Sequence, residues 1–288
     1  MEFDFSGSEV IAAQCLHGDK NFYKYLTDPE SDMHLDQAVS LFMIPKDIMT
    51  NTKTPEEKAK AKMIRFYSKN MWTFAQFYGD WFASCAPNLW ESVVEAGLEL
   101  PTGQTVKSWL EDNGIYDLGE MSKDGPTPGS FMEHCAKVEH KMWNERFPEY
   151  TQWKKDIVDF YVKYGYIENP MGFRFEGYMG KNQCCNYPIQ SLSFQMLLWT
   201  LIRVSRVIKK KKIKSELCGQ IHDSGLSIVH KDHVYKYAKE VKKIVDSMYH
   251  TFDWMKVPME IEIEVSEVKG NFSEMTEYSM KELKEKYS

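Results

Sequence analysis

Several features are missing from this 288-residue sequence, and each absence excludes a class of protein. No run of eighteen apolar residues occurs, so the sequence predicts no membrane-spanning helix and no membrane partner. The opening residues MEFDFSGSEV lack the basic and then apolar pattern of a signal peptide. The six cysteines show no C-x-x-C spacing, which excludes a small disulfide scaffold and favours reduced thiols in a cytoplasmic protein.

Positive charge is not in excess. The net charge is −6, which taken alone argues against nucleic-acid binding, although an enzyme needs only a positive groove. The clearest basic run, residues 209–214, is interpreted as a solvated loop before a strand. Apolar residues make up 43% of the chain and aromatic residues 14%, which is enough to bury the core of one large or two modest domains.

The pattern of apolar residues predicts β structure near both ends and helices between them. EFDFS alternates as a strand does, GQIHDSGLSIV predicts a hairpin, and residues 258–266 predict another strand. Helices are expected over residues 7–16, 32–42, 55–79, 188–208 and 232–249, with a mainly helical region at 81–165 and a β excursion at 166–185. We therefore expect an α+β fold whose sheet is built from both ends of the chain, with an inserted helical lobe.

Two groups of side chains indicate chemistry. A sheet built from both ends can place Asp4 beside Asp223, and two such carboxylates are the minimum needed to hold two Mg²⁺ ions. A turn role for Asp223 and a capping role for Asp4 stay open at this point. Arg65 and Lys69 share one helical face and suit a triphosphate, with an ordinary solvated face as the alternative.

Four blocks, in order, resemble the C-terminal part of the family A (polymerase I-like) DNA polymerases, particularly the phage-encoded branch. DFSGSE is similar to motif A, and DMHLDQAVSLF to the block that carries a phosphate-contacting histidine. RFYSKNMWTFAQFYG is similar to motif B, and NYPIQS followed by QIHDS to the Asn/Gln helix and motif C. Together the blocks cover nearly the whole chain.

The resemblance implies a role for each matching residue. Asp4 and Asp223 would be catalytic and would ligate two Mg²⁺ ions, with the backbone carbonyl of Phe5 as a further ligand. Glu9 would exclude ribonucleotides by crowding the 2′ position of the sugar. The remaining roles divide between the incoming dNTP (His34, Arg65, Lys69, Phe74) and the primer–template DNA (Tyr78, Gly79, Asn186, Gln190, His222).

The resemblance also implies an architecture. Residues 1–30 and 166–288 would form the palm and residues 31–165 the fingers, while the thumb would be absent. Because motif A begins at Asp4, we expect a split polymerase that is encoded by a phage and lies in the cytoplasm of the host. A second polypeptide would carry the thumb and the N-terminal palm, with or without a 3′–5′ exonuclease. The alternative is a fragment cut at this boundary.

The sequence departs from the family pattern at two places inside the motifs. Motif C usually ends His-Asp-Glu, whereas Ser224 stands in place of the glutamate. The family places its motif B residues at successive i+4 steps, but Phe74 follows Lys69 at i+5. An extra residue would turn the Phe74 face away, so we predict a π-bulge between Asn70 and Thr73.

The leading hypothesis is the catalytic subunit of a DNA-templated DNA polymerase. One alternative is a single-subunit RNA polymerase relative, against which Glu9 in the gate position argues. The other is a non-catalytic DNA-binding or assembly subunit with the same fold, against which the presence of both Asp4 and Asp223 argues.

Overall fold

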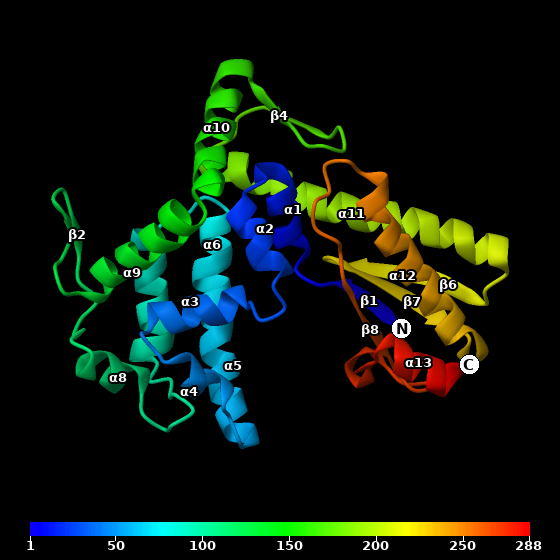
Figure 1. Cartoon of the computed structure of the whole chain (residues 1–288), viewed down its shortest axis with the longest axis horizontal. Helices are drawn as coiled ribbons and strands as arrows, with labels where there is room; N and C mark the ends of the chain where they lie inside the picture. The colour runs from blue at the N-terminus through cyan, green and yellow to red at the C-terminus, as the bar shows by residue number, and fades with distance from the viewer. The chain divides into compact units, whose positions relative to one another are not determined.

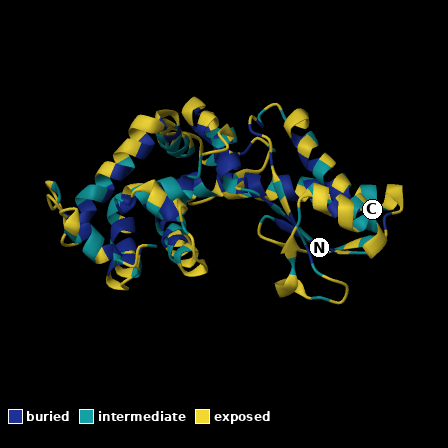
Figure 2. Ribbon diagram, turned by 60° about the horizontal axis from the view of Figure 1, so that its bottom comes forward, coloured by how far each residue is buried: buried dark blue, intermediate teal, exposed yellow.

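The computed structural model describes residues 1–288, which divide into two compact units. Unit 1 contains residues 1–18, 166–176 and 187–288, and unit 2 contains residues 19–165 and 177–186. Figure 2 shows buried and exposed residues alternating along the helices of both units, as expected where each helix packs one face on a core. No helix of the chain combines the length and the apolar character needed to cross a bilayer.

Unit 1 is built on a five-stranded antiparallel sheet with the strand order β6-β7-β1-β8-β9. The strands are β1 (Glu2–Phe5), β6 (Ser215–Ile221), β7 (Ser224–Val229), β8 (Ile261–Val265) and β9 (Thr276–Glu277). The N-terminal strand β1 lies between β7 and β8, and Figure 1 shows it in blue among the yellow and orange strands. The prediction of a sheet built from both chain ends is therefore confirmed.

The helices of unit 1 complete its core. They are α1 (Ser8–His17), the part of α11 (Lys181–Lys211) from residue 187 onward, α12 (Val234–Thr251), α13 (Met280–Tyr287) and the short η4 (Lys231–His233) and η5 (Phe272–Glu274), beside a small hairpin of β4 (Tyr166–Glu168) and β5 (Arg174–Glu176). Phe3 of β1 is completely buried. At Gly225 of β7, a β-carbon would lie 2.5 Å from Phe3 Cζ and 3.0 Å from Leu201 Cδ2, so α11 packs closely on the sheet at this point.

Unit 2 is mainly helical. Its elements are α2 (Lys20–Thr27), α3 (Met33–Leu41), α4 (Lys46–Thr50), α5 (Pro55–Ser68), η1 (Lys69–Thr73), α6 (Phe74–Phe77), α7 (Phe82–Leu89), η2 (Trp90–Glu95), α8 (Val106–Asp112), β2 (Met121–Ser122), β3 (Gly125–Pro126), α9 (Phe131–Glu139), η3 (His140–Arg146), α10 (Pro148–Tyr164) and the first turns of α11. Trp72 and Phe131 are among the large side chains buried in its core. The indole of Trp72 donates to Gln37 Oε1 at 2.9 Å, which pairs the one polar atom of this buried ring.

The predicted π-bulge is present. Residues Lys69–Thr73 form a π-helical turn, η1, between the α-helices α5 and α6. The α5 helix begins with a capping box, in which Thr54 accepts from the Glu57 amide while the Glu57 carboxylate accepts from the Thr54 amide. The wider turn of η1 absorbs the extra residue between Lys69 and Phe74, so both side chains can lie on one side of the helix.

Two expectations about the region after residue 180 are wrong. The helix α11 begins at Lys181 rather than at Pro188, and Pro188 lies inside it. Lys209, Lys210 and Lys211 end this helix instead of forming a loop. Basic side chains are favourable there because the C-terminal end of a helix carries partial negative charge, and Lys211 also pairs with Glu240 at 2.6 Å.

Candidate active site

The carboxylates of Asp4 and Asp223 lie on neighbouring parts of the unit 1 sheet. Asp4 belongs to β1 and is paired in register with Ser224, the first residue of β7. Asp223 lies in the turn between β6 and β7, and its carbonyl accepts from the Phe5 amide at 3.3 Å. Residues 219 positions apart in the sequence are thereby brought side by side, as the sequence analysis expected.

The turn that carries Asp223 is closed by polar contacts of its own. His222 adopts the left-handed conformation with φ 50°, which few non-glycine residues do. Ser224, the residue that replaces the family glutamate, is buried, and its hydroxyl donates to the Ile221 carbonyl at 3.0 Å. The side-chain amide of Gln220 donates to the His222 carbonyl at 2.9 Å. Ser224 thus fastens the turn and offers no further carboxylate.

Asp4 lies in a strongly negative environment. Burial raises its pKa to about 6, and the neighbouring charges of Asp223, Glu2 and Glu262 act in the same direction. Its Oδ1 atom is buried and has no hydrogen-bond partner. A partly buried carboxylate next to other carboxylates, with a free oxygen, is the arrangement that a cation would stabilise.

The donor set fits an oxygen-preferring divalent cation. The Phe5 amide donates to Asp223, and in an antiparallel strand the carbonyl of a residue points to the same neighbour as its amide. The Phe5 carbonyl is therefore expected on the side of the Asp223 turn, and its role as a ligand stays a prediction. Nowhere in the chain do three or more Asp, Glu, His or Cys side chains come together as a metal site.

Unit 2 brings a second set of the predicted residues together around the π-turn. The Phe74 ring lies 5.6 Å from the His34 ring and 6.2 Å from the Tyr78 ring, measured between centroids. The ammonium group of Lys69 lies 5.2 Å from the Phe74 ring centre, a cation–π distance. Without the π-turn, Lys69 and Phe74 would face away from each other, so this contact depends on it.

Arg65 is held by Asp32, which lies outside the predicted set of site residues. Its Nε and one terminal nitrogen donate to the two carboxylate oxygens of Asp32, at 2.9 and 3.0 Å. Asp32 is also the N-cap of α3 and accepts from the amides of His34 and Leu35. The pattern of an Asp before a helical run was the available signal for the cap, but not for the ion pair.

The imidazole of His34 is kept neutral. Burial and the cations Arg65 and Lys69 lower its pKa to about 4, against a smaller opposing effect of Asp32. Its Nδ1 atom is buried without a hydrogen-bond partner. An anion bound at this place would meet two cations and a ring that can take up a proton.

The other predicted residues are distributed over both units. Glu9 is in the first turn of α1, and His222 and Gln190 are exposed, all in unit 1. Gly79 follows the Phe74–Tyr78 segment in unit 2 and has φ 91°. A β-carbon there would approach Asn182 Oδ1 to 3.1 Å, so glycine lets the chain pass close to the start of α11. The side-chain oxygen of Asn186 is buried without a partner.

Parts of this chain are similar in sequence to known DNA polymerases. Residues 130–271 match the sequence model described as DNA polymerase family A. A DNA polymerase of Bacillus phage SP01 is 24% identical over 172 residues, which span 54% of this chain and 19% of that protein. DNA polymerase I of Chloroflexus aurantiacus is 21% identical over 145 residues, spanning 47% of this chain and 15% of that protein.

Over residues 130–271 the chain is therefore similar to DNA polymerase family A. In fold, the chain is similar to the POL domain of Pol1 from M. smegmatis, a structure described as a complex with DNA primer-template and dNTP. The similarity has a TM-score of 0.57 at 20% identity and covers 90% of this chain and 38% of that one. The chain thus spans about a fifth or less of the curated relatives, at 19% and 15% of their lengths.

The matched range covers one part of the predicted site. Asn186, Gln190, His222 and Asp223 lie within residues 130–271, whereas Asp4 and the cluster around Phe74 lie before it. For all of these residues, the individual roles stay predictions.

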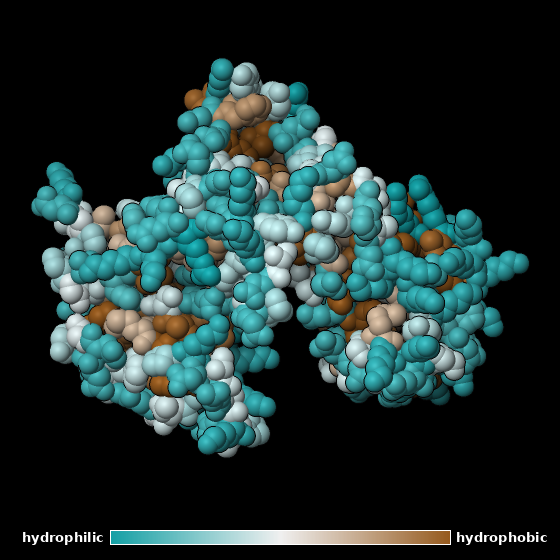
Figure 3. Space-filling model, in the orientation of Figure 1, coloured by the Kyte–Doolittle hydropathy of each residue, from teal (hydrophilic) through white to brown (hydrophobic).

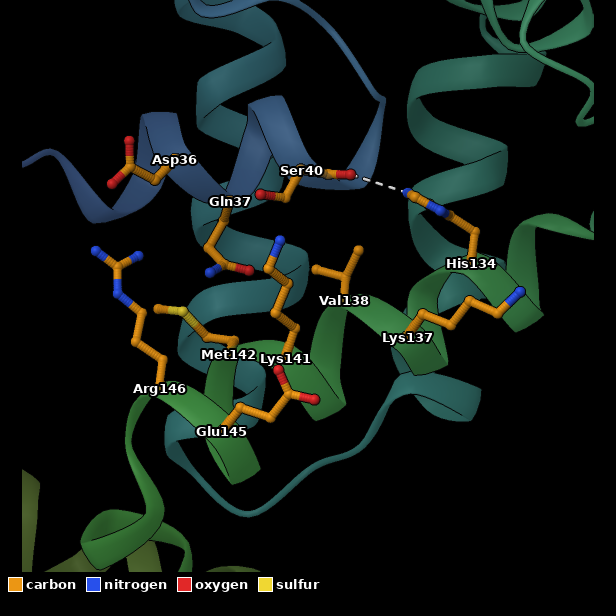
Figure 4. Close-up of a pocket in the computed structure, with 10 residues that line it drawn as sticks. All are labelled: Asp36, Gln37, Ser40, His134, Lys137, Val138, Lys141, Met142, Glu145 and Arg146. Carbon is orange, nitrogen blue, oxygen red and sulfur yellow. Dashed lines mark hydrogen bonds between the residues drawn. The ribbon is translucent and has the colours of Figure 1, made fainter.

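Unit 2 also contains a cavity of about 700 Å³ that was not predicted. It lies among α3, α9 and η3, and the His134 ring meets the Ser40 carbonyl at 2.9 Å across it (Figure 4). Lys137, Lys141 and Arg146 line it together with Asp36 and Glu145, so its charges are mixed. This balance indicates no particular ligand.

Proposed function

We propose that the chain is the catalytic palm-and-fingers part of a DNA-directed DNA polymerase. Unit 1 would be the palm and unit 2 the fingers. The observation that carries the proposal is the pairing of Asp4 in β1 with the Asp223 turn, through the Phe5 amide and the Asp4–Ser224 register. The match of residues 130–271 to the DNA polymerase family A model supports the same conclusion.

Asp4, Asp223 and the Phe5 carbonyl would hold two Mg²⁺ ions. When bound, the ions supply charge stabilisation for the attacking and leaving oxygens of phosphoryl transfer, in which the primer 3′-OH displaces pyrophosphate from a dNTP. The carboxylates fix where the ions bind, and the short rigid β1–β7 pairing fixes the carboxylates. The Phe5 amide bond to the Asp223 carbonyl ties the two ligand-bearing segments at that point.

The cluster in unit 2 would bind the triphosphate of the incoming dNTP. Lys69 supplies a positive charge beside the Phe74 ring, and Arg65 is held in a fixed orientation by Asp32. Preorganised cations bind an anion with a smaller loss of side-chain entropy than free ones. His34, whose pKa is about 4, would take up a proton when phosphate charge arrives.

Primer–template DNA would contact the residues that follow these two clusters. Tyr78 stacks on Phe74, and Gly79 brings the backbone next to Asn182, which suits a surface that meets a flat base. Asn186, Gln190 and His222 would contact the DNA near the new base pair. Glu9 would crowd the 2′ position of the incoming sugar.

The thumb and the rest of the palm would come from a second polypeptide, with or without an exonuclease. The chain covers 38% of the chain of the polymerase structure that it resembles, so a complete enzyme of that size needs further sequence. Unit 1 offers an apolar surface around a cavity of about 940 Å³, where Ile228, Val268 and Phe272 are 69%, 72% and 53% exposed. Hydrophobic patches also interrupt the largely hydrophilic surface in Figure 3. Exposed apolar surface of this kind is typical of protein interfaces.

Primer extension with Mg²⁺ and dNTPs tests the proposal, on the chain alone and together with the proteins that co-purify with it. We expect extension in the presence of the partner and none with Asp223→Asn. Extension that survives Asp223→Asn would favour the non-catalytic assembly subunit. Efficient extension by the monomeric chain alone would exclude an obligate second polypeptide.

The sugar selectivity separates the DNA polymerase from the RNA polymerase alternative. If Glu9 crowds the 2′ position, Glu9→Ala raises the incorporation of ribonucleotides relative to dNTPs. An unchanged ratio, or a wild-type chain that prefers ribonucleotides, would contradict the assignment.

A further inference from the structure

Two buried serines connect two helices of unit 1 to Asp223. Ser8, the first residue of α1, donates its hydroxyl proton to Asp223 Oδ2 at 2.7 Å. Ser193 of α11 donates in turn to Ser8 Oγ at 2.8 Å. Ser8 is 1% exposed and Ser193 is 4% exposed, so both hydroxyls are withdrawn from solvent, while Asp223 is half-buried.

We propose that Ser8 and Ser193 are positioning residues that fix the orientation of the Asp223 carboxylate for metal binding. The inference rests on the proposed function, because it assigns the serines a role toward the cation held by Asp223. Neither residue belongs to the set predicted from the motifs, and neither side chain is proposed to touch the cation.

The direction of the chain of hydrogen bonds follows from the chemistry of its members. An ionised carboxylate only accepts, so the single proton of Ser8 must point to Asp223. The Ser8 oxygen is then free to accept, and Ser193 is the donor that it meets. The result is a chain in one direction, from Ser193 through Ser8 to Asp223, with the carboxylate at its end.

Such a chain restrains a torsion that is otherwise soft. The carboxylate of an aspartate rotates about χ2 in a broad well with little intrinsic preference. A charge-assisted hydrogen bond to Oδ2 selects one orientation and leaves Oδ1 to bind a cation. Partners of this kind are known to tune metal affinity through the ligands that they orient.

The hydroxyl of Ser193 does not make the hydrogen bond within its own helix that is usual for Ser and Thr, as a comparison with Thr200 of α11 shows. Thr200, also buried on this helix, directs its hydroxyl to the Met196 carbonyl one turn earlier, at 3.0 Å, as Ser and Thr in helices commonly do. Ser193 points across to α1 instead. Gly7, with φ 65°, turns the chain from β1 into α1, so that Ser8 follows Asp4 closely enough to reach the Asp223 turn.

The orientation of Asp223 by Ser8 matters more at this site because only Asp4 and Asp223 are proposed as carboxylate ligands. Ser224 stands where the family motif has a glutamate, and its hydroxyl donates a hydrogen bond to the Ile221 carbonyl. With two carboxylates in place of three, the affinity for a cation depends more strongly on how each one is oriented.

Manganese binding to the metal-free protein measures the effect without any activity. Mn²⁺ affinity, from the EPR signal of the free ion, is compared for the wild type, Ser8→Ala, Ser193→Ala and the double variant. We expect Ser8→Ala to weaken binding about tenfold and Ser193→Ala to weaken it less. The double variant should match Ser8→Ala, because Ser193 acts only through Ser8.

Two controls make the experiment decisive. Ser227→Ala breaks another buried hydroxyl pair in unit 1, with Tyr237 at 2.5 Å, and should lower the melting temperature without changing Mn²⁺ affinity. Asp223→Asn should abolish binding. If Asp223→Asn binds Mn²⁺ as the wild type does, the metal assignment in the proposed function fails.

If Asp223→Asn abolishes binding but Ser8→Ala leaves it unchanged, only the positioning role fails. Crystal structures of the metal-free wild type and Ser8→Ala test the same point without a cation. We expect one carboxylate orientation at Asp223 in the wild type and a rotated or divided one in the variant. The same single orientation in both would overturn the inference. If Ser8→Ala does not fold, Ser193→Ala supplies the comparison.

Discussion

The neutral His34 beside two cations predicts that triphosphate binding is coupled to proton uptake. In the free protein, burial, Arg65 and Lys69 lower the pKa of His34 from 6.5 to about 4. This shift corresponds to a cost of about 3 kcal/mol for charging the ring. A triphosphate bound at the cluster opposes the two cations and returns the pKa towards its ordinary value.

The size of the effect follows from linkage. If binding restores a pKa near 6.5, the affinity for a dNTP should rise about tenfold between pH 8 and pH 5.5, because the bound form alone gains the proton. In the absence of ligand, lowering the pH has the opposite kind of effect, because it decreases the stability of the folded protein. The unfolded chain takes up the proton below its pKa of about 6.5 and the folded chain only near 4, so His34 lowers stability as the pH falls through this range.

Isothermal titration of dNTP into the metal-free protein at several pH values measures the coupling, with His34→Gln as the matched variant. The dNTP and other groups titrate in both proteins, so the difference between the two pH profiles reports His34. NMR of the imidazole should show a midpoint near 4 that moves up when dNTP is present. Identical pH profiles for wild type and His34→Gln would refute the proposed contact.

Three further predictions concern stability. Gly225→Ala places a β-carbon 2.5 Å from Phe3 Cζ and should lower the free energy of unfolding, measured in urea, by about 1–3 kcal/mol. Gly180→Ala, whose β-carbon meets only Gln183 Oε1 at 3.8 Å, should leave it nearly unchanged. Equal effects of the two substitutions would contradict the packing argument. Asp32→Asn keeps a helix cap but breaks the ion pair with Arg65, so it should lower the free energy of unfolding by about 0.5–1 kcal/mol. Asp32→Ala also removes the cap and should lower it by about 1 kcal/mol more. Equal losses for the two variants would show that the cap contributes nothing. The raised pKa of Asp4, about 6, means that the folded state favours the protonated form, so its contribution to stability is greatest at low pH and is lost as the pH rises through about 4 to 6. Asp4→Asn should therefore stabilise the metal-free protein at pH 8 by about 1 kcal/mol after solvent screening, but not at pH 4, which thermal unfolding at the two pH values checks.

Much of the fold was predictable because it depends on local patterns. Alternating residues in EFDFS predicted β1, and the Thr54 cap with Pro55 predicted the start of α5. The i+5 step from Lys69 to Phe74 predicted the π-turn, since a regular helix could not place both residues on one side. Each of these signals spans only a few residues, and the local backbone responds to it directly.

The sequence failed where a local rule competes with long-range packing. A proline usually marks the first turn of a helix, so Pro188 predicts a helix that begins there. In the structure α11 begins at Lys181 and continues through Pro188. The buried residues Cys184, Cys185 and Ile189 on both sides of it belong to packed surfaces, and tertiary packing of this kind outweighs the cost of a missing helical hydrogen bond.

The residue types of the candidate site follow from the sequence alone, because the motifs and their spacing identify its carboxylates, cations and aromatic rings. Which other side chains hold these residues in place depends on the fold. The Ser8–Asp223 hydrogen bond joins residues 215 positions apart, Ser193–Ser8 joins residues 185 apart, and Arg65 meets Asp32 across 33 residues. A hydroxyl or a carboxylate has no sequence signature for a distant partner, since hydrogen bonds form only between groups that folding has already brought within about 3 Å.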